Sequence, residues 1–98
     1  MPSELHELAQ LRSEMLNAMY RQFPQALDCN LLVMECRGPF RQRPETWLHD
    51  AISEQLKVLS YAGLIRSSRN GYTLTERGRQ DRQQAARFMG NTPPPEAA

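Results

Sequence analysis

The chain has 98 residues, enough for one domain with a modest core and too few for a catalytic domain joined to a regulatory one. Apolar residues make up 40% and charged residues 23%, an ordinary globular composition, and no stretch approaches the ~18 apolar residues of a membrane span. The formal net charge of +1 alone neither favours nor excludes a nucleic-acid partner. Because residues 1–14 also lack a signal-peptide pattern, we expect a cytoplasmic protein with no membrane association.

The first predicted element is a long amphipathic helix over residues 3–23. Apolar side chains recur there in steps of three or four residues, as one face of a helix requires. The members of this stripe are Leu5, Leu8, Leu11, Met15, Met19 and Phe23. Ser3 is suited to cap the helix, and Pro24 ends it because the residue before a proline disfavours the helical region.

A second helix is predicted over residues 28–37, with Asp28 as its N-cap and with Gly38 and Pro39 at its end. Its run LLVMEC is almost wholly apolar, so we expect a central and largely buried helix. Cys29 and Cys36 lie seven residues apart on it, a rise of roughly 10 Å, which exceeds the ~7 Å between Cα atoms that a disulfide tolerates.

Both cysteines are therefore expected to be reduced and to pack in the core. A metal site made of Cys29, Cys36 and His49 lacks the CxxC or HxxxH spacing typical of such sites. We expect neither a metal nor a cofactor.

A turn leads to a third helix over about residues 44–62, where Pro44 and the adjacent Glu45 suit the first helical turn. One arc of its helical wheel is apolar and should face the core; its members are Leu48, Ala51, Ile52, Gln55, Leu56, Leu59 and Ala62. The opposite arc is polar and should face solvent; its members are Thr46, His49, Asp50, Ser53, Lys57 and Ser60. Gly63 is placed to end the helix in the left-handed conformation, with Leu64 folding back on Leu59.

After Gly63 the apolar residues no longer recur at the helical period. The pair Asn70-Gly71 between two β-prone pieces predicts a two-stranded hairpin over residues 64–75. A two-residue loop at that pair would place Arg69 opposite Tyr72. One face of the hairpin should then carry Ile65, Tyr72 and Leu74, and the other Arg66, Ser68 and Thr73.

Thr75 is suited to cap a last, very polar helix over residues 76–88, ERGRQDRQQAARF. Its arginines form either a solvated face or one that contacts DNA or a second copy; they are Arg77, Arg79, Arg82 and Arg87. The final residues contain three prolines and no core residue. We therefore expect one domain over residues 1–89 and a disordered tail over residues 90–98.

Three helices, a two-stranded hairpin and a C-terminal helix form the order of a winged helix-turn-helix, a mainly α fold with a small β-hairpin. Residues 53–78 resemble the segment from recognition helix to wing in bacterial winged-helix regulators of the ArsR, MarR and PadR families, in LKVL…AGLIR and YTLTERG. The metal-sensing cysteine motif of ArsR sensors is absent, so metal regulation does not carry over. The chain is also similar, in LNAMYRQFP and the GLI…LT close, to small winged-helix proteins of Mu-like prophages.

The resemblance implies a protein that binds double-stranded DNA, a transcriptional regulator acting as a homodimer through its first and last helices. In such proteins the third helix enters the major groove and the wing meets the adjacent backbone. Carried onto this chain, the DNA-contacting residues are Arg41, Arg43, Thr46, His49, Ser53, Lys57, Arg66, Arg69 and Asn70.

Charge is distributed unevenly along the chain. Residues 1–63 hold six basic and eight acidic groups, net −2, whereas residues 64–98 hold six basic and three acidic groups, net +3. A positive wing and last helix favour DNA. The third helix, however, carries Glu45, Asp50 and Glu54 against Lys57 alone, which favours an alternative: a winged-helix protein-interaction module of a phage or mobile-element assembly without DNA binding. An enzyme is not expected, since the sequence has no Ser/His/Asp order and no glycine-rich phosphate loop.

Overall fold

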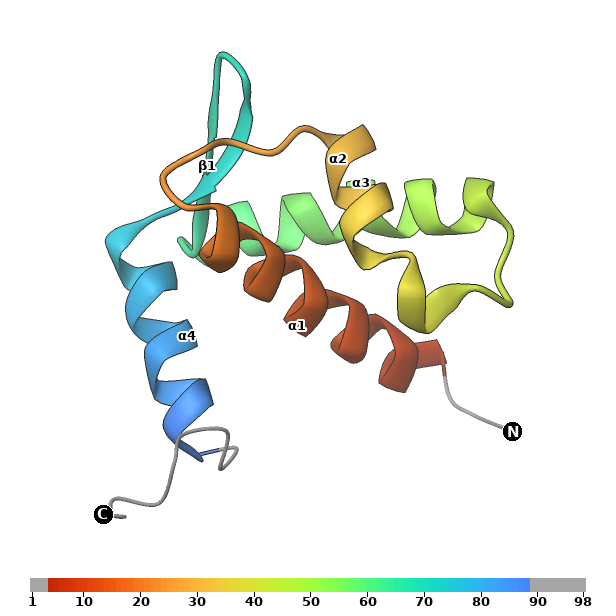
Figure 1. Ribbon diagram of the computed structural model, residues 1–98, viewed down its shortest axis with the longest axis horizontal. Helices are drawn as coiled ribbons and strands as arrows, with labels where there is room; N and C mark the ends of the chain where they lie inside the picture. Colours follow the sequence, from red (N-terminus) through yellow and green to blue (C-terminus); the bar gives the residue numbers. More distant parts are fainter. Residues whose placement is uncertain (1–3, 89–98) are drawn as a thin grey trace.

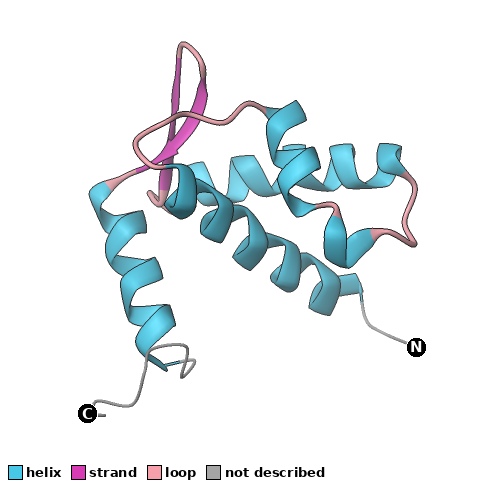
Figure 2. Ribbon diagram, viewed as in Figure 1, coloured by secondary structure: helices cyan, strands magenta, loops and turns pink. Residues whose placement is uncertain are grey.

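The computed structural model describes residues 4–88, which fold into four α-helices and one two-stranded antiparallel hairpin. The elements in chain order are α1 (Glu4–Gln22), α2 (Cys29–Cys36), a 3₁₀ turn (Gly38–Phe40), α3 (Glu45–Tyr61), β1 (Ile65–Ser68), β2 (Gly71–Leu74) and α4 (Glu76–Phe88). The expected class, mainly helical with a small hairpin, is confirmed for these residues (Figures 1 and 2). The expected cap Ser3 and the tail over residues 90–98 lie outside the described residues.

The first three helices pack around one apolar core, which Ile65 and Leu74 of the hairpin complete. The largest fully buried side chains are Leu11, Met15, Met19, Leu32, Cys36, Leu48, Ile52 and Leu59. The apolar arc predicted for α3 is buried except at Ala62, which is exposed and follows the last helical residue. The stripe on α1 is buried only in its middle, since Leu5 at one end and Phe23 at the other reach the surface.

The second helix is less buried than its composition suggests. Asp28 caps it as predicted, since its side chain accepts a hydrogen bond from the backbone N–H of Leu31 at 2.8 Å. Leu31 is nevertheless 42% exposed and Met34 72% exposed. An eight-residue helix that packs against α1 and α3 presents its remaining side to solvent, and the helical period places these two residues one turn apart on that side. The prediction of a largely buried helix was therefore wrong for α2.

The end of α3 has the hydrogen-bond pattern that was expected around Gly63. Gly63 adopts φ +80°, its N–H donates to the carbonyl of Ser60 at 3.0 Å, and the N–H of Leu64 donates to the carbonyl of Leu59 at 3.0 Å. These two bonds define a Schellman motif. They turn the chain directly from α3 into the hairpin, which projects from the helical body (Figure 1).

The hairpin is present, but its register differs from the predicted one by two residues. Ile65 pairs with Leu74 and Ser68 with Gly71, so the loop is Arg69-Asn70 rather than Asn70-Gly71. A shift of two residues preserves the alternation of side chains, so the two faces are as predicted. One face carries Ile65, Tyr72 and Leu74, and the other carries Arg66, Ser68 and Thr73.

The cause of this register is the chain between α1 and α2. Leu27 and Tyr72 exchange two backbone hydrogen bonds, of 2.9 and 2.8 Å, so residue 27 forms a bridge along the outer edge of β2. Gly71 lies directly against this segment with φ +135°, and a Cβ added there would stand 2.5 Å from the carbonyl carbon of Leu27. Gly71 therefore serves a close backbone approach within the strand and not the hairpin loop.

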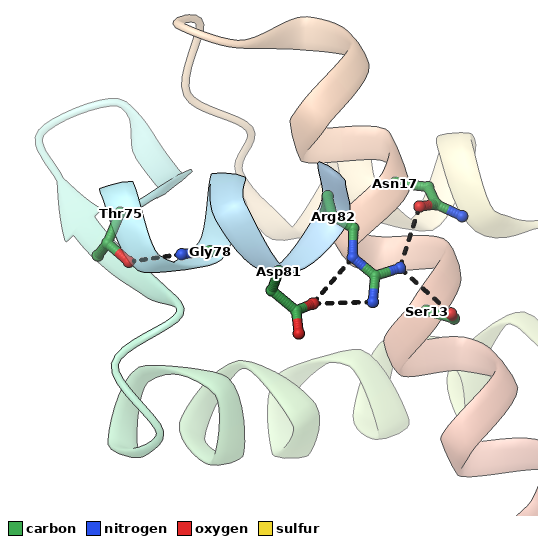
Figure 3. Close-up of polar contacts among 6 residues, drawn as sticks. All are labelled: Ser13, Asn17, Thr75, Gly78, Asp81 and Arg82. Carbon is green, nitrogen blue, oxygen red and sulfur yellow. Dashed lines mark hydrogen bonds and ion pairs between the residues drawn. The ribbon is translucent and has the colours of Figure 1, made fainter. Parts of the chain in front are cut away.

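The junction between the hairpin and α4 is fixed by Thr75 (Figure 3). Its hydroxyl accepts a hydrogen bond from the N–H of Gly78 at 3.1 Å, as expected of an N-cap. The same hydroxyl donates to the carbonyl of Gly63 at 2.6 Å. The backbone N–H of Thr75 also donates to the carbonyl of Leu64 at 3.0 Å. The start of α4 is thus tied to the turn that ends α3.

Two of the four arginines on α4 belong to the fold and not to an open face. The side chain of Arg82 is only 12% exposed, and it contacts Asp81, Asn17 and Ser13, which ties α4 to α1 (Figure 3). The guanidinium of Arg79 lies 4.6 Å from the centre of the Phe23 ring. The sequence could not assign these two, because Ser13, Asn17 and Phe23 lie more than 50 residues earlier in the chain.

Candidate nucleic-acid interface

The outer face of α3 carries the four predicted contacts that lie on this helix. Because the apolar arc of α3 packs into the core, the opposite arc faces outward. Thr46, His49 and Lys57 are exposed there, and Ser53 is half-buried. Their spacing of three or four residues places them in one row along the helix, here called the α3 row. The structure therefore brings these four residues together on one surface.

The N-terminus of α2 and one face of the hairpin border the α3 row. The Sγ atom of Cys29 lies 3.6 Å from Nε2 of His49 and 3.7 Å from Oγ of Ser53. Cys29, Ser53, Lys57 and Ser67 of β1 line one hollow together. The surface that a partner could reach thus extends continuously from the α3 row to the hairpin.

Sequence reasoning does not single out Cys29 or Ser67 for this surface. Ser67 shares a hairpin face with Tyr72, so strand alternation was a usable signal for it. The approach of Cys29 to α3 depends on how two helices pack, and no local pattern encodes it.

Two acidic residues of α3, Asp50 and Glu54, lie along one edge of the α3 row. Asp50 and Glu54 line a different hollow, which they share with Leu8 of α1 and with Trp47. Glu54 also lies 3.7 Å from the ammonium group of Lys57, with both side chains at least 70% exposed. An exposed pair of this kind contributes little to stability and breaks easily. Asp50 and Glu54 therefore lie along the edge of the α3 row that adjoins α1, whereas Glu45 at the start of α3 pairs with Arg37 at 3.3 Å.

The two arginines that precede α3 differ in their surroundings. Arg43 pairs with the carboxylate of Glu7 on α1, and its guanidinium lies 4.5 Å from the centre of the Trp47 ring. Arg41 is exposed and has no ion pair within residues 4–88. To contact DNA, Arg43 would have to break its ion pair with Glu7, whereas Arg41 has no ion pair to break among the described residues.

The three predicted wing contacts do not share one surface. Arg69 occupies the loop at the tip of the hairpin, exposed and without an ion pair among the described residues. Arg66 projects from the hairpin face opposite to Ser67, and it lines a separate hollow with Asn70 and Phe23. Arg69 and Asn70 form the loop at the end of the hairpin, and of these two only Arg69 lies outside the hollow that Arg66 lines.

Within residues 4–88, no group of three or more His, Cys, Asp or Glu side chains is arranged to hold a metal ion. Across the same residues, no helix is both long enough and apolar enough to cross a membrane. Comparisons with protein-family models, with curated proteins and with solved structures find no match. The function is therefore inferred from the fold and the geometry of the site.

The placement of α2 predicts unequal reactivity of the two free cysteines. Cys36 is fully buried, and burial, with the nearby carboxylates of Glu14 and Glu35, raises the pKa of its thiol from 9.0 to about 12. Cys29 is half-buried at the start of α2. At pH 8, Ellman's reagent should therefore react with one thiol in the folded chain and with two after unfolding in guanidinium chloride.

Cys29→Ser should remove the reactive thiol, and Cys36→Ser should leave it. Rapid reaction of both thiols in the folded chain would contradict the buried position of Cys36.

Proposed function

We propose that this chain is a winged-helix DNA-binding protein, and that it acts as a transcriptional regulator in the cytoplasm. In this proposal α3 enters the major groove and the hairpin segment over residues 64–75 meets the adjacent backbone. The observation that carries it is the continuous exposed surface formed by the α3 row, the hollow beside Ser67 and the tip of the hairpin at Arg69.

The architecture supports the proposal. The described residues run in the order α1, α2, α3 and hairpin. A β-bridge at Leu27 joins the chain between α1 and α2 to the hairpin. Arg82 ties α4 to α1 (Figure 3), and no residue of α4 lines the hollow beside the α3 row. A duplex would therefore meet α3 and the hairpin without displacing another element of the fold.

The side chains of the α3 row suit contacts with base edges. The hydroxyl groups of Thr46 and Ser53 can each donate and accept a hydrogen bond. The imidazole of His49 can also donate or accept one, and the ammonium group of Lys57 can donate to guanine or to phosphate. Arg41 and Arg69, which have no ion pair among the described residues, are suited to phosphate. Phosphate contacts would supply affinity, and the α3 row would supply base preference.

A homodimer is part of this proposal. One half-site offers few base contacts, and a dimer doubles them. The sides of α1 and α4 that do not meet within the chain are the surfaces proposed for it. Sedimentation equilibrium across a range of protein concentrations measures the mass directly.

A protein-interaction module without DNA binding is the second candidate. It is favoured by the carboxylates of Asp50 and Glu54 beside the α3 row, which would repel a phosphate backbone. Tyr61, on the same helix and 97% exposed, is a further side chain suited to a protein interface.

A double variant separates the two candidates. Lys57→Ala with Arg69→Ala should weaken binding to a labelled random-sequence duplex by about 10-fold per lost phosphate contact at 0.1 M salt, and should lower the salt slope by about two. The matched control is Arg77→Ala with Arg87→Ala, which removes the same charge from exposed positions on α4.

Fluorescence anisotropy with the labelled duplex gives both quantities, and the control variant should stay within about threefold of the unsubstituted chain. Equal losses of affinity in the two double variants would show that binding depends only on the net charge of the chain. Absence of binding to any duplex would instead favour the protein-interaction module.

A further inference from the structure

A hollow lies on the side of the hairpin that faces away from α3. It is bordered by the connection between α1 and α2 and by the face of the hairpin that carries Arg66, Ser68 and Thr73. None of the residues that line it is acidic. The α3 row and Arg69, on which the proposed DNA surface depends, lie outside this hollow.

Two polar side chains stand next to each other in this hollow. Arg66 and Thr73 are direct cross-strand partners, so their side chains project from the same face at neighbouring positions. Arg66 is exposed and has no ion pair among the described residues. Thr73 is only 8% exposed, yet its hydroxyl has no hydrogen-bond partner within residues 4–88. A buried hydroxyl without a partner is unfavourable, and a ligand oxygen held by the neighbouring Arg66 would offer it one.

Apolar side chains form the adjoining wall. Phe23 and Leu31 line the hollow and are 37% and 42% exposed. Met34, one helical turn beyond Leu31 on α2, is 72% exposed. Apolar surface that gathers in one place marks an interaction site more often than isolated exposed residues do.

The shape of the hollow distinguishes between kinds of ligand. A small molecule binds tightly where a pocket encloses most of its surface, and this hollow is open to solvent. Its apolar wall also continues past the hollow to Met34, farther than a small acid would cover. An extended segment of a protein can cover both the polar pair and the apolar wall.

We propose that this hollow is the docking site for an acidic, apolar segment of a partner protein, with a carboxylate on Arg66 and Thr73 and an apolar side chain on Phe23 and Leu31. Charge complementarity selects the acidic segment, because the hollow has an unpaired arginine, no carboxylate of its own, and Arg69 in the adjacent loop. The site is separate from the α3 row, so the two could be occupied together. The proposal goes beyond DNA binding and does not depend on it.

Selection from a displayed library of random 12-residue peptides against the whole chain tests the proposal. The enriched peptides should combine Asp or Glu with Leu, Phe or Met, and should shift the backbone amide signals of residues 22–31 and 66–73. Arg66→Glu should weaken their binding about 10-fold or more, as loss of a charge-assisted bond predicts, whereas Arg77→Glu, with the same change of charge on α4, should not.

Thr73→Val keeps the shape of the side chain and removes the unpartnered hydroxyl. It should raise the thermal midpoint of the chain and yet weaken peptide binding about threefold, a combination that a purely structural role would not give. Four results would overturn the proposal: no enriched peptide, enrichment of basic or uncharged peptides, equal losses with Arg66→Glu and Arg77→Glu, or displacement of the peptide by duplex DNA. Displacement of the peptide by millimolar butyrate would also overturn it, in favour of a site for small carboxylic acids.

Discussion

Gly71→Ala should lower the free energy of unfolding by about 3 kcal/mol or more, a large part of the ~5–15 kcal/mol typical of a domain. Two causes act together. An alanine at φ +135° is strained, which costs about 1–3 kcal/mol. Its Cβ would also stand 2.5 Å from both the carbonyl carbon and the carbonyl oxygen of Leu27, which are backbone atoms and cannot move aside as a side chain can.

Chemical denaturation followed by circular dichroism measures this effect. Gly38→Ala is the matched control, because a Cβ there meets no atom within 4 Å and its φ is not positive. The control should change the free energy of unfolding by less than about 1 kcal/mol. A similar stability for the two variants would show that the Leu27–Tyr72 bridge does not hold the hairpin against the chain between α1 and α2.

Thr75→Val should cost about 2 kcal/mol, because one hydroxyl serves two backbone groups. The substitution removes the acceptor for the N–H of Gly78 and the donor for the carbonyl of Gly63, while the shape of the side chain is nearly unchanged. Both groups lie at the junction of α3, the hairpin and α4. Loss of the hydroxyl should therefore loosen α4 more than the rest of the chain.

Thr75→Ser retains the hydroxyl and should cost less than about 1 kcal/mol. Amide hydrogen exchange in Thr75→Val should accelerate first in α4, and only later in α1 and α3. Uniform acceleration along the whole chain, or equal stability of the two variants, would contradict the account of this junction.

The order and type of the elements could be predicted from local patterns. The apolar arc of α3 is evident from its period, and the caps at Asp28, Gly63 and Thr75 are evident from residue type and position. These features depend on residues within about one helical turn of each other, which a sequence displays directly. The boundaries of α4, Glu76–Phe88, equal the predicted range for the same reason.

Features that depend on distant residues were predicted wrongly or not at all. The hairpin register follows from the contact between Gly71 and Leu27, 44 positions earlier, and the pair Asn70-Gly71 by itself favours a different loop. Arg82 looked like a surface residue because its contacts on α1 are remote in sequence. The exposure of Met34 depends on the number of helices that surround α2.

The same distinction applies to the candidate interface. The α3 row follows from the helical wheel, so its four members were predictable. The positions of Arg43 beside Glu7, and of Arg66 on the far face of the hairpin, depend on how the elements pack. The uneven distribution of charge along the sequence indicated a positive C-terminal part. Arg79 and Arg82 are nevertheless held by contacts within the chain, so they do not form an open positive surface.

The central claim is that the α3 row and the tip of the hairpin together form a surface for duplex DNA. Backbone amide NMR of the ¹⁵N-labelled chain, titrated with a random-sequence duplex, tests it most directly. We predict that signals shift for residues 46–57 and 67–70, with little change in residues 77–87, and that added salt reverses the shifts. Shifts confined to α1 and α4, or no shifts at low salt, would contradict the claim.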